Sequence, residues 1–332
     1  MIRRPPRSTL SSSSAASDVY KRQLLWTPAD WAWIGGLLNI LFSSLHHGVP
    51  VLAYRFEKFD ALKAIQLMSE FKVTGSFLPP TALKMLRTAI PKTTSKKLFL
   101  KSVASGGEPL GTELLDWGNK VLGVNINEFY GQTECNLVLS SCSKIMKPRP
   151  GIVGPPVPGN IVSVIDQNGT KCKKGQLGTI AIKKGSPQMF LRYWNNTNAT
   201  NEKYINDWMI TGDKGVIEKD NWIRFVARDD DIITSGGYRI GPGPIEDCLM
   251  QHPSVSMAAV IGKKDSLRTQ IVKAFIVLNK GFIDSKVLRL ELQSFVRKNL
   301  SAHEYPREVE IVEKLPTTST GKILRRNLRD PN

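Results

Sequence analysis

Between residues 24 and 134, apolar side chains alternate between the spacing of an amphipathic helix and the unbroken runs of a buried strand. Strands that alternate with helices in this way predict a mainly parallel sheet covered by helices. The expected elements are a short apolar run at 49–54, a helix at 59–71, a strand at 73–78, a helix at 80–87, a strand at 98–104, a helix at 112–122 and a strand at 124–130.

From residue 151 to 225 the pattern changes to short apolar runs that are separated by frequent turns. Asn168-Gly169 lies between two such runs, and this dipeptide is typical of a hairpin turn. A small antiparallel barrel or sandwich is therefore expected there. After residue 230 the pattern is that of a compact α+β unit of small-domain size. Its expected elements are strand-like 231–240, a helix at 242–251, strands at 255–262 and 272–278, a helix at 285–300, a strand at 309–312 and a terminal basic helix.

The first 23 residues, MIRRPPRSTLSSSSAASDVYKRQ, differ from everything that follows them. They contain no apolar run, include a low-complexity Ser/Ala stretch and have Asp18 as their single acid. An Arg- and Ser-rich transit peptide is one interpretation. A translated sequencing-library adapter fused to an incomplete transcript fits better, so residues 1–23 are expected to be an adapter-like, non-native segment.

Composition raises the question of partners. The chain has 332 residues, of which 41% are hydrophobic and 23% are charged, as is typical of a globular protein. Lys and Arg number 46 against 29 Asp and Glu, which gives a net charge of +17. Residues 1–23 contribute five basic residues and one acid, so the rest of the chain carries +13. Such a surplus favours a polyanionic partner, which is a nucleic acid, an acidic membrane or a phosphate-rich cofactor such as ATP or coenzyme A.

Several classes of protein are disfavoured by the same sequence. No apolar run reaches the roughly 18 residues that a membrane helix needs. The basic residues are scattered without interleaved aromatic residues, so no nucleic-acid partner is expected. The cysteines are far apart, with neither Cys-x-x-Cys spacing nor a nearby His cluster, so neither a disulfide scaffold nor a zinc site is supported and a reducing compartment is expected. The four are Cys135, Cys142, Cys172 and Cys248. The oligomeric state stays open.

Two motifs follow apolar strands and could contact a nucleotide. The first is YGQTE at 130–134, where a Thr hydroxyl suits a phosphate oxygen and a Glu at the carboxyl end of a strand suits Mg²⁺. It could equally be a plain exit from a strand. The second is WMITGDKG at 208–215, in which Asp213 suits a bidentate grip on ribose hydroxyls. Taken alone, a turn Asp that the backbone satisfies is the simpler interpretation.

Two further motifs lie near the carboxyl terminus. In RDDDIITSGGYRI at 228–240, three consecutive acids repel one another unless a cation or solvent serves them, and Gly236-Gly237 permits close approach of a ligand or a simple bulge. A solvated hairpin tip is the plain alternative. In PTTSTGKILRR at 316–326, Lys322 offers a flexible ammonium that suits charge on a phosphoryl group. The plain alternative is a basic solubilising tail, which Arg325 and Arg326 are expected to form in part.

Taken together, in this order and at this spacing, the four motifs resemble those of the adenylate-forming acyl-CoA synthetase superfamily. SGGEPL at 105–110 is a fifth match, and WTPADWAW at 26–33 is similar to the segment that follows the family's phosphate loop. The resemblance implies an α/β fold. Residues 24–229 would be the C-terminal part of the AMP-binding domain, with a parallel β/α subdomain and a small β-barrel, and residues 230–332 would be a small α+β lid domain.

The resemblance also implies an activity. Members of this family activate a carboxylate with ATP and Mg²⁺ to an acyl-adenylate, release pyrophosphate, and then form a thioester with coenzyme A and leave AMP. Because two anions must meet, such a site neutralises charge with a metal and fixed cations. ATP, Mg²⁺ and coenzyme A are therefore the implied cofactors, and a small-molecule carboxylate is the implied substrate. The compartment would be the cytoplasm or the mitochondrial matrix.

The nucleotide contacts can be carried over residue by residue. By resemblance, Gly107 and Glu108 would border the adenine and Tyr130 would stack on it. Thr133 would contact phosphate, and Glu134 would ligate Mg²⁺.

The remaining contacts concern the sugar, the α-phosphate and the lid. Asp213 would accept from both ribose hydroxyls, and Arg228 would bind the ribose and phosphate side. Lys322 would reach the α-phosphate during the first half-reaction.

The lid of this family swings between the half-reactions about an Asp that matches Asp230. Lys322 would then leave, Gly236 and Gly237 would line the pantetheine tunnel, and Arg239 would help to hold a coenzyme A phosphate.

Gly131 concerns the substrate, because acetate-specific relatives carry a Trp there that fills the acyl pocket. A residue without a side chain predicts a carboxylate longer than acetate, of short to medium chain length. Two departures from the family pattern are Pro244, where relatives usually have Glu, and Ala227, where they usually have Gly. Proline is tolerated in a first helical turn, so the fold is expected to survive, with loss of a lid contact.

The largest departure is an absence, since no Ser/Thr/Gly-rich phosphate loop ending in Pro-Lys precedes Trp26. The chain by itself is therefore expected to be inactive or prone to aggregation, with an exposed sheet edge. Two alternatives stay open. One is an adenylating ligase with a different acceptor, and the other is a non-catalytic, truncated member of the family.

Overall fold

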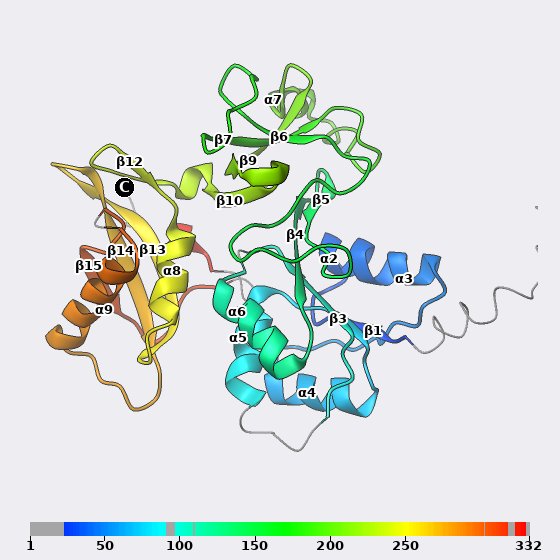
Figure 1. Cartoon of the computed structure of the whole chain (residues 1–332), viewed down its shortest axis with the longest axis horizontal. Coiled ribbons are helices and arrows are strands. Elements are labelled where there is room, and N and C mark those ends of the chain that lie inside the picture. Colours follow the sequence, from blue (N-terminus) through cyan, green and yellow to red (C-terminus); the bar gives the residue numbers. More distant parts are fainter. Residues whose placement is uncertain (1–22, 91–96, 109, 302, 318–322, 330–332) are drawn as a thin grey trace, which may run out of the picture.

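The structure is a computed structural model that describes residues 23–90, 97–108, 110–301, 303–317 and 323–329. Its helices and strands form three sheets with their covering helices (Figure 1). The α/β class that the sequence predicts is confirmed.

The first sheet has the order β1-β2-β3-β4-β5, in which the first four strands are parallel and the last is antiparallel. The expected alternation of strands and helices is therefore confirmed. Its strands are β1 (Leu25–Trp26), β2 (Gly75–Phe77), β3 (Ser102–Gly106), β4 (Ile126–Gln132) and β5 (Asn136–Ser140). Its helical segments are α2 (Ile34–Gly36), η1 (Leu37–Phe42), α3 (Ser43–His46), α4 (Ala61–Glu70), α5 (Pro80–Ala89), α6 (Thr112–Trp117) and η3 (Gly118–Leu122).

Local sequence explains where these helices begin. The Asp60 carboxylate accepts a hydrogen bond from the backbone N–H of Lys63 and caps α4, whose buried face includes Ile65 and Met68. Pro80 lies in the first turn of α5, where its missing N–H costs no helical hydrogen bond. The apolar run at 49–54 contributes only an isolated bridge, between Val51 and Leu25.

The second sheet is antiparallel, with the order β10-β9-β7-β6 and with β8 paired to β9. Because this order is linear, the described strands form an open sheet rather than a closed barrel. The connection after β6 turns at Asn168 and Gly169, as the dipeptide predicts, and Gly169 has a φ of +81°. The elements are β6 (Val162–Ile165), β7 (Leu177–Lys183), α7 (Thr197–Glu202), β8 (Tyr204–Ile205), β9 (Trp208–Ile217), η4 (Lys219–Asn221) and β10 (Ile223–Arg228).

The third sheet belongs to the carboxyl-terminal part, which is called the lid below. Its order is β12-β11-β14-β13, and β15 pairs in parallel with β14. The elements are η5 (Asp229–Asp231), β11 (Ile233–Ser235), β12 (Tyr238–Ile240), α8 (Pro242–Met250), β13 (Val255–Asp265), β14 (Thr269–Leu278), α9 (Lys286–Asn299), β15 (Glu308–Ile311) and η6 (Arg325–Asn327).

Two features that the sequence predicts for the lid are the helix that contains Pro244 and a basic helix at the carboxyl terminus. Pro244 lies in the first turn of α8, where it breaks no helical hydrogen bond, so the helix forms as expected. The expected terminal basic helix is wrong for the described residues, because only the 3₁₀ turn η6 forms there. The segment packs instead through Ile323 and Leu328 against the face of the lid sheet that contains Ile261.

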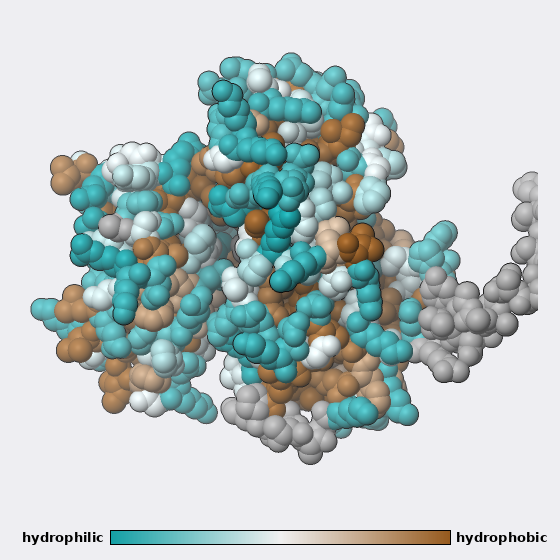
Figure 2. Space-filling model, in the orientation of Figure 1, coloured by the Kyte–Doolittle hydropathy of each residue, from teal (hydrophilic) through white to brown (hydrophobic). Residues whose placement is uncertain are grey.

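The other face of the lid sheet is covered by α8 and α9, whose Leu249 and Leu292 belong to one buried cluster with Val260. In the view of Figure 1 the lid lies on one side, the first sheet on the other and the second sheet above. The same face of the molecule is largely hydrophilic, with separate hydrophobic patches (Figure 2). Among the described residues, no helix is long and apolar enough to cross a membrane.

Candidate active site

Two predicted motifs come together at one edge of the parallel sheet. Residues 107–108 follow β3, and residues 133–134 follow β4. These strands are parallel neighbours that pair Gly106 with Phe129. The carboxyl ends of parallel strands meet at the same edge of a sheet, where ligands of α/β proteins commonly bind.

A hydrogen-bonded cluster joins this edge to the second sheet. Asp213 lies on β9 and is 4% exposed. Its Oδ2 accepts from the Tyr130 hydroxyl at 2.5 Å and from Gln132 Nε2 at 2.8 Å. Gln132 Nε2 also donates to the Thr211 carbonyl oxygen at 2.8 Å. Two donors on one oxygen fix the orientation of the Asp213 carboxylate.

The Tyr130 hydroxyl stays a donor at every ordinary pH. Burial, and then the neighbouring Asp213 charge, raise the pKa of Tyr130 well above its usual value. The ring also lies 6.1 Å from the ring of Phe225, in a tilted arrangement. The predicted residues Tyr130 and Asp213 are therefore brought together, and their contact is direct.

Arg228 provides the positive charge beside this cluster. It ends β10 and is the strand partner of Asp213 in the antiparallel pairing. Burial lowers the pKa of Arg228, but Asp213 and Asp230 raise it by more, so the guanidinium stays charged. Its Nε donates to Asp230 Oδ1 at 3.2 Å. An anion that approaches Asp213 would meet this cation.

Glu134 lies on the turn after β4, where a phenol and an ammonium approach it. The Tyr193 hydroxyl donates to Glu134 Oε1 at 2.5 Å, and Lys203 Nζ lies 3.8 Å from the same oxygen. Burial, and then the bond to Glu134, raise the pKa of Tyr193 to about 12. Thr133 is exposed on the same turn.

A magnesium ion fits Glu134 only as one of few protein ligands. Among the described residues, no group of three or more His, Cys, Asp or Glu could hold a metal, and no hydrogen-bond partner is described for Glu134 Oε2. Mg²⁺ commonly binds through one or two carboxylates, substrate phosphates and water. The Glu134 carboxylate therefore fits an ion that arrives with a nucleotide.

Gly107 and Glu108 lie on the neighbouring turn. Gly107 has a φ of +90°, a conformation that favours glycine, and open space where a side chain would begin. The Glu108 oxygens accept from Thr81 Oγ1 at 3.0 and 3.1 Å, which holds the turn against α5.

Gly131 has a structural reason to be glycine. A Cβ at this position would collide with the backbone carbonyl of Asn136 on β5, and its distance to Leu137 Cα would be 3.1 Å. A side chain there would separate β4 from β5. Substitution of Gly131 by Trp would therefore not report on acyl-pocket size alone.

Each of the three consecutive acids at the junction with the lid forms an ion pair, which is one of the two possibilities that the sequence left open. Asp229 lies 3.3 Å from Lys214 Nζ on β9 and 3.3 Å from Arg239 Nη2 on β12. Asp230 pairs with Arg228 at 3.2 Å. These pairs are solvent-exposed on the Asp side, so each contributes little to stability.

Asp231 differs from its two neighbours because it is mostly buried. It pairs with Arg329 and lies 3.6 Å from Arg325 Nη1. Arg325 also grips Glu246 on α8, with Nη2 2.7 Å from one carboxylate oxygen and 2.9 Å from the other. The expectation that Arg325 belongs to a solubilising tail is therefore wrong. Its carboxylate partners lie 79 or more positions earlier, so the local sequence carried no signal for them.

The Gly236-Gly237 pair forms the two-residue turn of the hairpin β11–β12, with φ values of +56° and +85°. Positive φ at both central positions is typical of the turn that suits a tight hairpin. The hairpin lies at the outer end of the lid, well away from β4 (Figure 1). The structure does not bring these glycines or Arg239 to the Tyr130 cluster. Lys322 lies outside the described residues.

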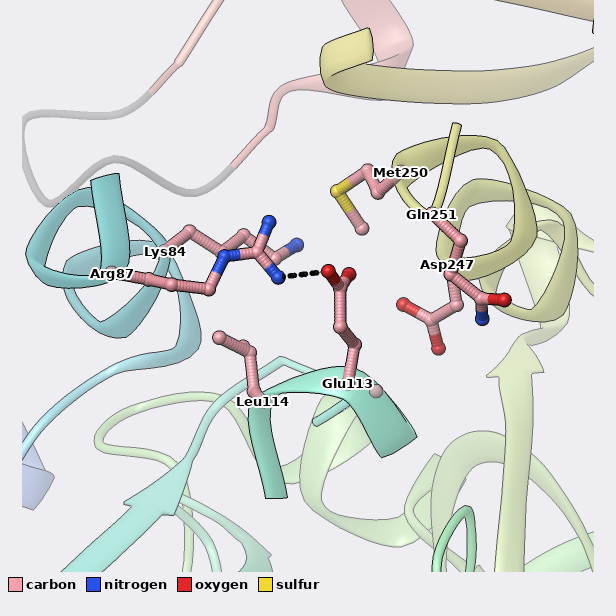
Figure 3. A pocket seen from close by; sticks show the side chains of 8 residues that line it. Lys84, Arg87, Glu113, Leu114, Asp247, Met250 and Gln251 are labelled. Atoms are coloured by element: carbon pink, nitrogen blue, oxygen red, sulfur yellow. Dashed lines mark ion pairs between the residues drawn. The ribbon is translucent and has the colours of Figure 1, made fainter. Parts of the chain in front are cut away.

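A small crevice separates the lid from the first sheet (Figure 3). The Arg87–Glu113 ion pair of α5 and α6, at 2.5 Å, lies on one side, and Asp247 of α8 lies on the other. Burial raises the pKa of Asp247 to about 6, against the opposite effect of Lys84. The crevice encloses about 10 Å³, which is room for one water molecule rather than for a nucleotide.

Two family profiles match separate parts of the chain. The profile described as AMP-binding enzyme matches residues 7–194, and the profile described as AMP-binding enzyme C-terminal domain matches residues 244–322. The chain is 37% identical over 317 residues to the mitochondrial acyl-coenzyme A synthetase ACSM3 of Rattus norvegicus, and 34% identical over 317 residues to the acetyl-coenzyme A synthetase of Bacillus subtilis.

These alignments cover 94% of this chain but only 54% and 55% of the two relatives, so the chain spans about half the length of the curated relatives it matches. Among solved structures, the anthranilate CoA ligase AuaEII in complex with anthranoyl-AMP superposes with a TM-score of 0.85 at 29% identity. That superposition covers 92% of this chain and 59% of the ligase.

Proposed function

Because the chain belongs to the AMP-binding enzyme family, we propose that it forms part of an acid–thiol ligase. The proposed enzyme activates a carboxylic acid with ATP to an acyl-adenylate and pyrophosphate, and then transfers the acyl group to coenzyme A and releases AMP. The observation that carries the proposal is the Asp213 carboxylate, held by Tyr130 and Gln132 beside the Arg228 cation at the carboxyl edge of the sheet.

This cluster suits the nucleoside part of AMP. A carboxylate whose orientation is fixed by two donors can accept from the adjacent hydroxyls of a ribose without reorganising when the ligand arrives. Arg228 would provide a cation on the phosphate side of the nucleotide. Gly107 and Glu108, on the next turn, would border the adenine, with Tyr130 against its face.

The reacting end of the nucleotide would face Thr133 and Glu134. The exposed Thr133 hydroxyl can donate to a phosphate oxygen, and Glu134 would hold the magnesium ion through a carboxylate that Tyr193 and Lys203 orient. When bound, the ion neutralises phosphate charge so that a carboxylate can attack the α-phosphorus. Lys322 would supply a further cation at that phosphate.

The substrate is proposed to be a carboxylate longer than acetate, of short to medium chain length. The similar proteins include an acyl-coenzyme A synthetase, ACSM3, and an acetyl-coenzyme A synthetase, so they support activation of an acyl group and leave its chain length to the proposal. Gly131 supports this proposal less than its sequence position implies, because its backbone neighbours already require glycine. A mitochondrial matrix or cytoplasmic setting suits such an enzyme.

An adenylating ligase with a different acceptor is the second candidate, because the amide bond synthetase McbA shares the fold with a TM-score of 0.78 at 25% identity. A CoA-dependence assay separates the two candidates. Thioester formation that requires coenzyme A supports the first, and acyl transfer to an amine without coenzyme A supports the second.

Calorimetric titration of AMP into the chain tests the nucleotide site directly. Asp213→Asn keeps the shape of the side chain but removes its charge, so AMP affinity should fall by about tenfold or more. The matched control is Asp220→Asn, whose carboxylate pairs with Arg149 on the surface. Equal losses in the two variants, or none in Asp213→Asn, would contradict the proposal.

A further inference from the structure

The four residues Asp231, Glu246, Arg325 and Arg329 form a group that we call the terminal clamp. Arg325 makes a bidentate contact with Glu246, and Arg325 and Arg329 both reach Asp231. Glu246 also accepts from the backbone N–H of Val260 at 2.8 Å. The clamp therefore ties the junction, helix α8 and the lid strand β13, at the end of the sheet order, to the terminal turn η6.

Burial distinguishes the clamp from the rest of the junction. The side chain of Asp231 is 13% exposed, whereas those of Asp229 and Asp230 are 54% and 66% exposed. Exposed ion pairs exchange with water at little cost. A buried ion pair is costly to break from one side, because the remaining charge is left without a partner.

The junction therefore has two parts: Asp231, which the clamp holds to the lid, and Asp229 and Asp230, whose exposed ion pairs open easily. Asp229 touches Lys214 of the second sheet and Arg239 of the lid, and both contacts can open into solvent. Asp231 cannot follow such a motion without leaving the clamp. A rotation of the lid that keeps the clamp intact would therefore have to occur at the residues before Asp231.

We propose that Arg325 is a positioning residue that locks Asp231 to the lid and so sets the pivot about which the lid turns. This inference rests on the proposed function and on the change of lid orientation between the two half-reactions that the family resemblance implies. The Glu108 charge, which lies outside the lid, is among those that raise the pKa of Arg325 against the effect of burial.

A pair of engineered cysteines provides a reporter of lid orientation. Gly111 precedes α6 in the large part, and Asp247 lies on α8. A Cβ at position 111 would lie 2.9 Å from Asp247 Cγ, close to where a sulfur at position 247 would be. A disulfide of ordinary geometry can therefore close between Gly111→Cys and Asp247→Cys in this lid orientation. Its rate of formation in the full chain is followed by mass spectrometry of the linked peptides.

Loss of the clamp should let the lid leave the described orientation. In the reporter chain, Arg325→Gln should slow disulfide formation by about fivefold or more, because fewer molecules hold the two positions together. Asp231→Asn should slow it similarly while it keeps the Arg325–Glu246 pair, which covers the case in which Arg325→Gln does not fold.

The matched control is Lys273→Met, which removes the ion pairs of Lys273 with Glu308 and Glu310 inside the lid. It should lower the melting temperature of the lid without changing the rate of disulfide formation. A reporter that never closes, an Asp231→Asn chain that closes at the reporter rate, or an equal slowing by Lys273→Met would overturn the inference. The readout needs no nucleotide, so failure of AMP binding would count against the proposed function alone.

Discussion

Tyr130 donates its hydroxyl hydrogen to Asp213 across 2.5 Å, although the two residues are 83 positions apart in the chain. The contact joins the end of a parallel strand to a strand of the antiparallel sheet. It brings together two motifs that the sequence offers separately, each of which alone has a plain structural interpretation. Their proximity is what turns two weak signals into one candidate nucleotide site.

Tyr130→Phe removes one of the described donors to the buried Asp213 carboxylate. We expect the free energy of unfolding to fall by about 1–3 kcal/mol, because the carboxylate loses a charge-assisted hydrogen bond. Denaturant unfolding measures this change. Tyr204→Phe is the matched control, since the hydrogen bond that the described part of the chain gives its hydroxyl is a weak one, to the Met189 sulfur at 3.5 Å. Equal stability losses in the two variants would contradict the assigned contact.

Glu128 predicts a dependence of stability on pH. Burial, partly opposed by the Leu110 N–H and assisted by Asp247, raises the pKa of Glu128 from 4.5 to about 7. Between these values the unfolded chain loses a proton that the folded chain keeps, so stability falls as the pH rises from about 4.5 to about 7. The expected loss from this group is roughly 2–4 kcal/mol.

Glu128→Gln tests this pH dependence, because an amide does not titrate and still offers an oxygen to Leu110. The unfolding free energy of the variant, relative to the unchanged chain, should rise across the same pH window. A constant difference from pH 4.5 to 7.5 would show that Glu128 titrates normally.

Substitution by alanine should lower the free energy of unfolding by different amounts at Gly131 and at Gly107. At Gly131 the new Cβ meets the backbone of Asn136, so Gly131→Ala should lower the unfolding free energy by about 1–3 kcal/mol or more. At Gly107 the space is open and only the positive φ opposes a side chain, so Gly107→Ala should cost about 1 kcal/mol. A smaller cost at Gly131 than at Gly107 would mean that β4 and β5 are not held together there.

The elements with a strong period were predictable from sequence. The helix expected at 59–71 is α4, and the strand expected at 124–130 is β4, shifted by two residues. Their apolar positions face one continuous core, so the local pattern and the tertiary packing agree.

The polar contacts of the site were less predictable, because they depend on distant partners. Gln132 stands inside a predicted motif, yet its amide contacts Asp213 and Thr211 on another sheet. From the sequence, Arg325 is expected to be a solvated basic residue, but in the structure it pairs with the buried carboxylates of Asp231 and Glu246. The period of apolar residues shows which face of a helix or strand is buried. It does not show which charged side chain of another element will contact that face.

The most direct test of the nucleotide site compares the affinity of the chain for AMP with that for 2′,3′-dideoxy-AMP. The two ligands share the base and the phosphate and differ only in the hydroxyls that Asp213 is proposed to bind. The account predicts that AMP binds at least about tenfold more tightly, because removing the hydroxyls leaves a buried carboxylate without its ligand partners. Equal affinities, or no binding of either nucleotide, would contradict it.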